Sequence, residues 1–381
     1  MSLYLDNAAT SFPKPPTVLG AVMNVLEAVG ASPGRGAHKH AREAMSILSR
    51  CREKTAAFLG VTKADRVIFT KNATESINLV LKGFLRPGDR VLISSMEHNS
   101  VVRPLHALAD RGVTTATIPS GSDGDPDLRA LVSMLDPPTR LVVLVHVTNV
   151  NGALMPVAEV SEMCRRARVP LLLDAAQSAG IQPVAAEDWG LGMFACSGHK
   201  GLLGPPGLGV LYIRPDIDVL PLMEGGTGSL SEDFNQPEFC PDRFESGTPN
   251  LPALAGLIQG IDFISGIGID RIRQHEFTLA SIIENELPRI PGVRVLAPKV
   301  RGTGTVSFVV DGMNPADIGF ALDQTFGIAV RTGLHCAPLA HRTLGTFPAG
   351  TVRVSPGYST TEEEIEYFLN SLRSILSLRT R

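Results

Sequence analysis

Short apolar runs and amphipathic stretches follow one another along the first two thirds of the chain. The apolar runs show little polar alternation, which is typical of strands buried on both faces of a sheet. They are residues 66–70, 91–94, 141–147 and 171–174. The stretches with apolar side chains at helical spacing are residues 74–85, 101–111 and 157–168. This alternation predicts an α/β fold, in which helices cover both faces of a mostly parallel sheet.

The pattern changes at about residue 251. Two long helical stretches are followed by short strand-like segments and by a final helix over residues 360–378. We interpret this part as a smaller α+β domain of residues 251–381, which residues 1–15 join. Residues 16–250 then form the large α/β domain.

The composition is that of an ordinary globular chain. Its 381 residues are 44% hydrophobic and 19% charged, which is enough for a large core and two domains. The formal net charge of −3 gives no basic footprint, so nucleic acid is not expected as a partner. The longest apolar run, residues 141–145, is too short to cross a bilayer, and the N-terminus lacks the features of an export signal.

The cysteine pattern also fits an ordinary globular chain that carries no export signal. Five cysteines stand far apart without a Cys-x-x-Cys pair, so neither a zinc site nor a dithiol switch is expected. They are Cys51, Cys164, Cys196, Cys240 and Cys336. We expect reduced thiols in a cytoplasmic protein without a membrane segment or a metal.

Lys200 is the residue on which the functional prediction depends. It follows an apolar run that ends at Ala195, whereas most lysines are solvated surface residues. Upstream, the strand over residues 170–174 brings Asp174 to its carboxyl end, where open α/β sheets bind their ligands. Such a pair suits pyridoxal 5'-phosphate (PLP), because the amine forms a Schiff base and the carboxylate keeps the pyridine nitrogen protonated.

Two short motifs make the pattern more specific. Asp174-Ala-Ala-Gln177, followed by Ser197-Gly-His-Lys200, resembles the class V aminotransferase-like family and the cysteine desulfurases within it. The resemblance implies a fold-type I PLP-dependent transferase with a seven-stranded sheet. It assigns Lys200 and Asp174 the roles given above. Its other cofactor residues are His98 stacked on the ring, Asn149 and Gln177 near the phenolic oxygen, and Ser197 and His199 as phosphate ligands.

A strand-to-helix turn at residues 71–76 offers a further anion site. Backbone N–H groups and the positive helix end would hold a phosphate there, although an ordinary N-cap by Asn72 or Thr74 is an equal alternative. The resembling family often has two adjacent hydroxyls in this segment. Here Ala73 precedes Thr74, so one side-chain contact is expected to be missing.

Residues 243–250 resemble a segment whose threonine reaches the phosphate of the neighbouring subunit. The resemblance therefore implies a homodimer in which Thr248 contributes to the neighbouring active site. The alternative is a simple Gly-Thr-Pro turn before the helix that begins at Leu251.

The segment Arg331-Thr-Gly-Leu-His-Cys336-Ala narrows the reaction. Arg331 and His335 give Cys336 a plausible electropositive setting for a thiolate, although most single cysteines are inert. The segment resembles the corresponding motif of group II cysteine desulfurases, which include selenocysteine lyase-like enzymes. That family more often has histidine at the position of Leu334. The leucine is expected to affect substrate preference or the mobility of the loop.

Arg353 lies in a strand over residues 351–355 and resembles the family's substrate arginine, since a guanidinium suits a carboxylate; a surface arginine is the alternative. With Asn149 and Arg331 it completes the expected substrate site. The implied reaction converts L-cysteine to L-alanine, with sulfur held as a persulfide on Cys336 for an unidentified acceptor. Lys200, Cys336 and His98 would be the catalytic residues.

Two classes of alternative remain open at this point. One is another reaction on the same scaffold, such as selenocysteine cleavage, aminotransfer or β-elimination, because fold does not fix function. The other is a non-catalytic sulfur-relay or scaffold protein, against which the intact Lys200 and Asp174 argue.

Overall fold

The structure is a computed structural model that describes residues 3–34 and 36–377. At its centre is a seven-stranded sheet with the strand order β2-β8-β7-β6-β5-β3-β4. The strands are β2 (Val67–Thr70), β3 (Arg90–Ser94), β4 (Thr114–Ile118), β5 (Leu141–Val145), β6 (Leu171–Asp174), β7 (Met193–Ser197) and β8 (Gly209–Ile213). In this sheet β8 runs antiparallel to both neighbours and the other strands are parallel to one another. The expected mostly parallel seven-stranded sheet is confirmed.

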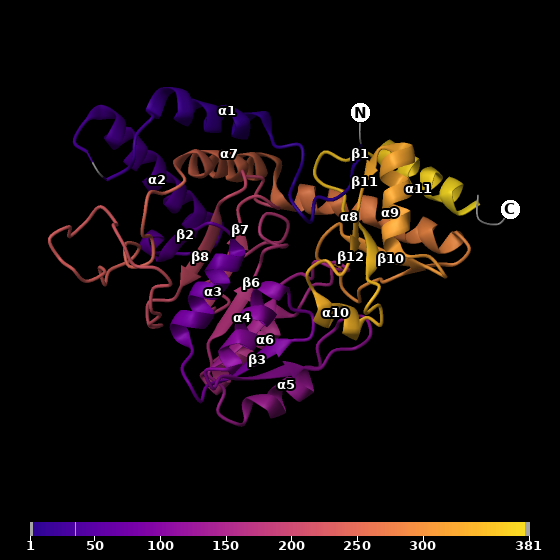
Figure 1. Cartoon of the computed structure of the whole chain (residues 1–381), viewed down its shortest axis with the longest axis horizontal. Coiled ribbons are helices and arrows are strands. Elements are labelled where there is room, and N and C mark those ends of the chain that lie inside the picture. The colour runs from indigo at the N-terminus through magenta and orange to yellow at the C-terminus, as the bar shows by residue number, and fades with distance from the viewer. Residues whose placement is uncertain (1–2, 35, 378–381) are drawn as a thin grey trace.

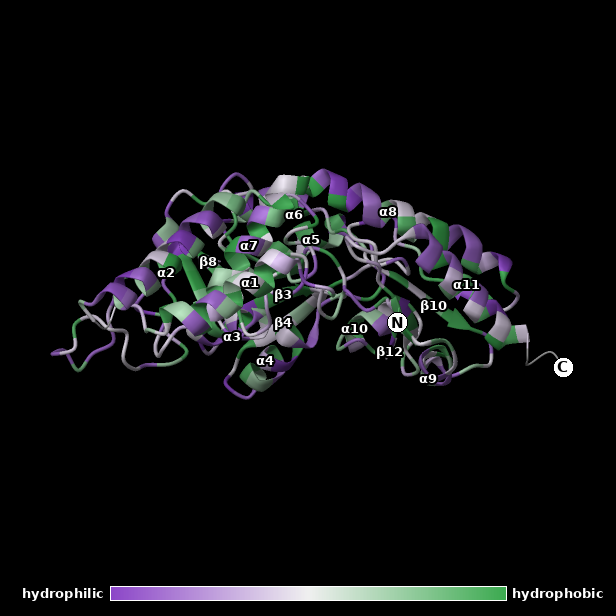
Figure 2. Cartoon of the chain, turned by 90° about the horizontal axis from the view of Figure 1, so that it is seen from above, coloured by the Kyte–Doolittle hydropathy of each residue, from purple (hydrophilic) through white to green (hydrophobic). Residues whose placement is uncertain are grey.

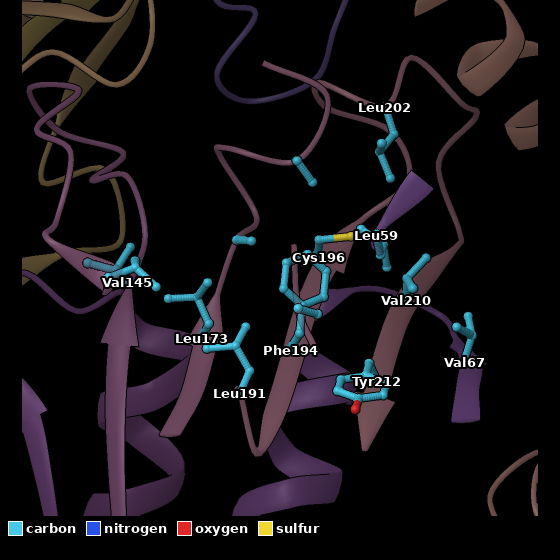
Figure 3. Packing of buried hydrophobic residues seen from close by; sticks show 14 of the residues in the cluster. Leu59, Val67, Val145, Leu173, Leu191, Phe194, Cys196, Leu202, Val210 and Tyr212 are labelled. Carbon is cyan, nitrogen blue, oxygen red and sulfur yellow. The ribbon is translucent and has the colours of Figure 1, made fainter. Parts of the chain in front are cut away.

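Helices cover both faces of this sheet (Figure 1). Side chains alternate along β7, so that Phe194 and Cys196 pack on one face while Met193 and Ala195 pack on the other. The helices with several side chains in the first core include α2 (Lys39–Phe58), α6 (Val157–Ala167) and α7 (Leu251–Ile267), and α5 (Leu128–Leu135) contributes Leu131. Those in the second core are α3 (Ala73–Phe84) and α4 (Asn99–Ala109). Figure 3 shows the first core, where Phe194 and Cys196 lie among side chains of neighbouring strands.

The sequence pattern does not predict β4 or α5. Strand β4 lies at the edge of the sheet, next to β3 alone, and most of its side chains are exposed. Its threonines therefore lack the continuous apolar pattern that identifies the central strands. Helix α5 is short, with Leu131 as its buried residue, and an eight-residue helix gives a weak periodic signal.

The small domain contains a four-stranded sheet in the order β12-β13-β10-β9, with antiparallel pairing throughout. Its strands are β9 (Val293–Val295), β10 (Val306–Val310), β12 (Arg331–Gly333) and β13 (Thr351–Val354). Its helices are α8 (Ile269–Glu286), α9 (Pro315–Phe326), α10 (Pro338–Thr343) and α11 (Glu362–Ser377). The short N-terminal strand β1 (Leu3–Tyr4) pairs in parallel with β11 (Ile328–Ala329). Seen from above, the two domains lie side by side, with α8 and α11 at the outer edge of the smaller one (Figure 2).

Helix α7 lies against α1 (Pro16–Asn24) and α2, at the large-domain end of the molecule (Figure 1). Its apolar residues, among them Leu254, Leu257 and Ile261, belong to the core of the large sheet. The domain boundary at residue 250 stays a prediction, and this packing favours a boundary near the junction of α7 and α8.

No single helix in the described ranges is long and apolar enough to cross a membrane. Helices α7 and α8 together pass that test by length and composition, but they are bent by 80° relative to each other. Since α7 is packed into the large core, its apolar character is explained by burial.

Candidate active site

Several predicted residues meet at the carboxyl edge of the large sheet. Parallel strands end at one edge, and the loops that follow them therefore bring distant residues together. Asp174 ends β6, Ser197 ends β7, and Asn149 follows β5. His98 lies in the loop between β3 and α4, just before the helix, and Lys200 follows β7. We call Asp174, Asn149, His98 and Lys200 the sheet-edge group.

Lys200 and Asp174 form the electrostatic centre of this group. Burial lowers the pKa of Lys200 to about 8, although the charges of Asp174 and Cys336 act in the opposite direction. Burial also raises the pKa of Asp174, against the effects of the Ala176 N–H group, Lys200 and Ser100. The Ala176 amide donates to Asp174 Oδ1 at 2.9 Å. The amine can therefore exchange a proton near neutral pH, as a Schiff-base lysine requires.

His98 caps helix α4 with its imidazole. Its Nδ1 accepts the backbone N–H of Ser100 at 3.0 Å, so a neutral ring carries its proton on Nε2. Burial and the nearby Lys200 and Arg331 lower the pKa of His98 to about 4. The imidazole is consequently neutral at pH 7, which suits a ring that stacks on a flat, partly charged ligand.

Arg353 is fully buried, which excludes the alternative of a surface arginine. Its Nη2 forms a 2.6 Å ion pair with Asp6 Oδ1, and its Nη1 donates to the main-chain oxygen of Asn149 at 2.9 Å. Within the described residues its Nε has no hydrogen-bond partner. A buried guanidinium with an unused donor is suited to bind a carboxylate.

Cys336 lies in the loop of residues 334–337, which we call the thiol loop. Its side chain is exposed, and Arg331 Nη2 lies 3.6 Å from its sulfur. The backbone N–H of Asn99 donates to the Cys336 carbonyl at 2.8 Å, which joins the loop to the residue after His98. The thiol therefore stands beside the sheet-edge group, although it comes from the other domain.

His335 does not contribute the positive charge that the sequence suggests. Its side chain is buried, and burial together with Arg353 strongly lowers its pKa, so the ring is neutral. Arg331 is the cation in contact with the thiol.

The turn before α3 serves as a helix cap and remains open to an anion. Asn72 Oδ1 accepts the N–H of Glu75 at 2.9 Å, so Asn72 is the N-cap. Ala73 is buried and the Thr74 side chain is exposed in the first turn. Across the same groove lies His199, whose buried Nδ1 lacks a hydrogen-bond partner among the described residues. If this Nδ1 carries the ring proton, its unused N–H donor fits a phosphate group bound at the N-terminus of α3.

Two further expected residues, Gln177 and Thr248, make contacts outside the sheet-edge group, although Gln177 lines one pocket together with Lys200. Gln177 is buried, and its Nε2 donates to the Ala8 carbonyl of the N-terminal segment at 2.9 Å. Thr248 is exposed in the irregular segment of residues 214–250, where it borders the groove that Asn72 and His199 also line. Their roles toward a cofactor stay predictions.

Sequence reasoning missed three residues that support the site. Asp6 holds Arg353, Ser100 contacts His98 Nδ1 through its hydroxyl at 2.9 Å, and Glu97 is fully buried beneath the edge. Glu97 and Ser100 flank His98 in the polar stretch of residues 97–100 that follows a buried strand, and that polarity was the available signal. For Asp6 the partner is 347 residues away, so no local pattern could find it.

A family model described as Aminotransferase class-V matches residues 3–368 of the chain. Among curated proteins, a probable cysteine desulfurase of Methanothermobacter thermautotrophicus is 36% identical, over 99% of this chain and 95% of its own length. A cysteine desulfurase of Pectobacterium atrosepticum is 33% identical, over 98% of this chain and 92% of its own length.

Solved structures give the same result. The apo structure of a cysteine desulfurase from Thermococcus onnurineus superposes with a TM-score of 0.93 at 33% identity, covering 99% of this chain and 95% of that one. The cysteine desulfurase CsdA of Escherichia coli, in an S-sulfonic acid form, superposes with a TM-score of 0.90 at 27% identity and the same coverage.

Proposed function

Because the chain belongs to the aminotransferase class-V family, we propose that it is a PLP-dependent cysteine desulfurase. It would convert L-cysteine to L-alanine and hold the sulfur as a persulfide on Cys336. The observation that carries this proposal is the arrangement of Lys200, Asp174 and Cys336. Lys200, whose pKa burial lowers to about 8, and the buried Asp174 belong to the sheet-edge group, and the exposed Cys336 is joined to that edge by the hydrogen bond from the Asn99 N–H group to its carbonyl oxygen.

The residues present fit PLP. Lys200 would bind its aldehyde carbon and Asp174 its ring nitrogen, while the N-terminus of α3 with Thr74, Ser197 and His199 would bind its phosphate. The orphaned Nδ1 of His199 supports this assignment, because a buried polar atom needs a partner. When bound, the cofactor supplies an electron sink for carbanion chemistry at the substrate.

The chain's own groups would then orient the substrate and move its protons. Arg353, with Asn149 beside it, would bind the carboxylate of L-cysteine. Lys200 exchanges a proton near neutral pH because its pKa is about 8. His98, neutral at pH 7, would stack on the cofactor and relay protons through its Nε2.

The sulfur step balances without an outside oxidant. The Cys336 thiolate attacks the substrate sulfur, the carbon–sulfur bond breaks, and its electron pair stays with the substrate carbon. Protonation of that carbon gives alanine, while the new sulfur–sulfur bond leaves a persulfide on Cys336. A reductant or an acceptor protein must then remove the sulfur. Arg331 Nη2 lies 3.6 Å from the Cys336 sulfur, so a guanidinium would face the nucleophile during this step.

The decisive experiment measures alanine and sulfide from L-cysteine with a thiol reductant. We expect Cys336→Ala to keep the cofactor absorbance and to lose at least about 10³-fold in rate, since it lacks the nucleophile. Cys240→Ala is the matched control, because Cys240 is a half-buried thiol that contacts Arg66. Equal turnover by wild type and Cys336→Ala would overturn the proposal. In that case selenocysteine and amino-group acceptors become the substrates to test.

We also propose a homodimer in which Thr248 completes the neighbouring site. Large apolar side chains are exposed on α1, on the helical turn of residues 25–29 that follows it, and on the segment of residues 214–250, which protrudes from the body (Figure 1). They include Leu19, Met23, Leu26, Leu222, Met223 and Phe234. Burial of such exposed apolar side chains against a second subunit would favour association.

Co-expression of Lys200→Ala and Thr248→Ala subunits tests this arrangement. If Thr248 acts across the interface, each mixed dimer has one intact site, and random pairing gives about a quarter of wild-type activity. No gain over the separate variants, or full activity of Thr248→Ala alone, would contradict it. A cytoplasmic location stays a prediction.

A further inference from the structure

The thiol loop has a backbone that needs outside support. His335 and Cys336 have φ angles of 47° and 57°, in the left-handed region that non-glycine residues rarely occupy. Two carbonyl groups of the loop accept hydrogen bonds from the large domain. Asn149 Nδ2 donates to the His335 oxygen at 2.6 Å, and the Asn99 N–H donates to the Cys336 oxygen at 2.8 Å.

The His335 side chain makes a third hydrogen bond that anchors the thiol loop, in this case to the small domain. Its Nε2 lies 2.8 Å from Thr351 Oγ1 of β13. Thr351 Oγ1 lies 3.2 Å from Ser307 Oγ of β10, and Ser307 Oγ lies 2.5 Å from the carbonyl oxygen of Val150. His335, Thr351 and Ser307 are all buried, so water does not compete for these contacts.

The direction of each hydrogen bond follows from counting protons. The Val150 carbonyl can only accept, so the single hydroxyl proton of Ser307 points to it. Thr351 then donates its own hydroxyl proton to Ser307. Thr351 Oγ1 is left as an acceptor toward His335, so His335 Nε2 must carry a proton. Because burial keeps the ring neutral, its Nδ1 is unprotonated.

We propose that His335 is a positioning residue for the Cys336 thiol and acts through its Nε2–H donor. This inference rests on the proposed function, since it assumes that Cys336 is the nucleophile. The chain His335–Thr351–Ser307–Val150 anchors the residue before the cysteine to the small-domain sheet. The anchored loop keeps the sulfur beside Arg331, 3.6 Å away, and next to the sheet-edge group.

The position of the Nε2–H donor can be tested with two substitutions of His335. A glutamine side chain places an N–H donor near the position of Nε2, whereas asparagine is shorter and places its polar group near Nδ1. His335→Gln should therefore keep the anchor, and His335→Asn should lose it. At the other end Thr351→Val removes the acceptor at nearly constant volume, and Thr351→Ser retains it.

The readout is the rate at which iodoacetamide alkylates Cys336, measured on the cofactor-loaded protein. A Cys240→Ala background leaves Cys336 as the accessible thiol, because Cys51, Cys164 and Cys196 are buried. We expect His335→Asn and Thr351→Val each to slow alkylation about fivefold or more, because the thiol leaves its cation. His335→Asn and Thr351→Val combined with each other, or either combined with Arg331→Ala, should slow alkylation little more than one substitution alone. All three substitutions act through the same contact between Arg331 and the Cys336 sulfur. His335→Gln and Thr351→Ser should stay within about twofold of the background protein.

A second set of measurements distinguishes positioning of the thiol by His335 from a general structural effect of the substitutions. With L-cysteine, kcat should fall in the Asn and Val variants while KM and the cofactor absorbance stay unchanged. Nitrogen NMR of labelled histidine should show His335 protonated on Nε2 only. Wild-type alkylation rates in both His335→Asn and Thr351→Val, equal slowing in His335→Gln, or a protonated Nδ1 would overturn the inference.

The outcomes also separate this inference from the proposed function. If the wild type fails to turn over L-cysteine but the alkylation pattern holds, the desulfurase proposal fails and the positioning role stands. If the wild type turns over L-cysteine and the pattern is absent, the positioning role alone fails.

Discussion

The sheet-edge group and the thiol loop reach the same site by different means. Asp174, Asn149 and His98 follow adjacent parallel strands, and the register of β5 against β6 pairs Val145 with Asp174. The backbone ladder therefore fixes their spacing. The thiol loop follows the edge strand β12 of the small sheet and has two left-handed residues. It is held by individual hydrogen bonds, two from side chains and one from the Asn99 backbone. From this difference we expect substitutions at the sheet edge to alter cofactor binding. Substitutions in the thiol loop should alter the transfer of sulfur to Cys336.

The largest expected effect tests the sheet-edge half of this comparison. Lys200→Ala removes the amine that would hold the cofactor covalently, so turnover of L-cysteine should fall by at least about 10³-fold. The cofactor should also be lost on dialysis, which absorbance of the dialysed protein measures. Alkylation of Cys336 should remain rapid. A Lys200→Ala protein that retains its colour and its turnover would contradict the assignment.

Glu97 offers a stability test of the same edge. Its Oε1 accepts from Ser94 Oγ at 2.5 Å and from the Val145 N–H at 2.8 Å, while Oε2 has no partner among the described residues. Burial raises the pKa of Glu97 from its usual 4.5 to about 8. A neutral acid therefore links β3 and β5 below Asp174. Glu97→Ala should cost about 2–4 kcal/mol of unfolding free energy, and Glu97→Gln much less.

The pH dependence of this effect has a definite sign. Between pH 4.5 and about 8 the folded protein keeps the Glu97 proton that the unfolded chain releases. Stability from this group is therefore fully present below pH 4.5 and is lost as the pH rises to 8, by at most about 1.4 kcal/mol per unit. Urea unfolding at several pH values should show a shallower slope for Glu97→Gln. Glu276 contributes to the pH dependence that remains in this variant, because burial raises the pKa of Glu276 to about 8 as well. An unchanged slope would refute the neutral acid.

Asp6 tests the support of the substrate arginine. Removing its charge weakens a charge-assisted hydrogen bond to Arg353, so Asp6→Asn should raise the KM for L-cysteine about tenfold, with a smaller change in kcat. Steady-state kinetics check this. Arg353→Lys should have a larger effect, because an ammonium cannot replace the guanidinium's several donors. If Asp6→Asn leaves the KM unchanged, Asp6 does not position Arg353 for substrate.

The smallest expected effect concerns the anion turn. Ala73→Ser restores a hydroxyl beside Thr74 and should tighten PLP binding about two- to tenfold through one further hydrogen bond. Titration of the protein without cofactor measures this. Ala73→Gly, which adds no donor, is the control. Weaker binding by the serine variant would mean that the buried Ala73 side chain faces neighbouring atoms and not the phosphate.

The sequence by itself determined the α/β fold and the sheet-edge positions. The hydrophobic pattern is a local property of the sequence, and it places Asp174 and Asn149 at strand ends whose order the parallel topology then fixes. Continuous apolar runs predict the central strands, whereas the exposed β4 and the short α5 carry no such signal. The resemblance of two short motifs singled out Lys200 and Cys336, and their catalytic roles stay predictions.

Only the tertiary structure decided which partners those residues have. Asp6 and Arg353 are 347 positions apart, and Asn149 and His335 are 186 apart, so no window of sequence joins them. Tertiary packing also reversed the expected role of His335, because burial makes its ring neutral and turns it toward Thr351. Charge and protonation depend on burial and on neighbours in space, and chain folding alone sets both.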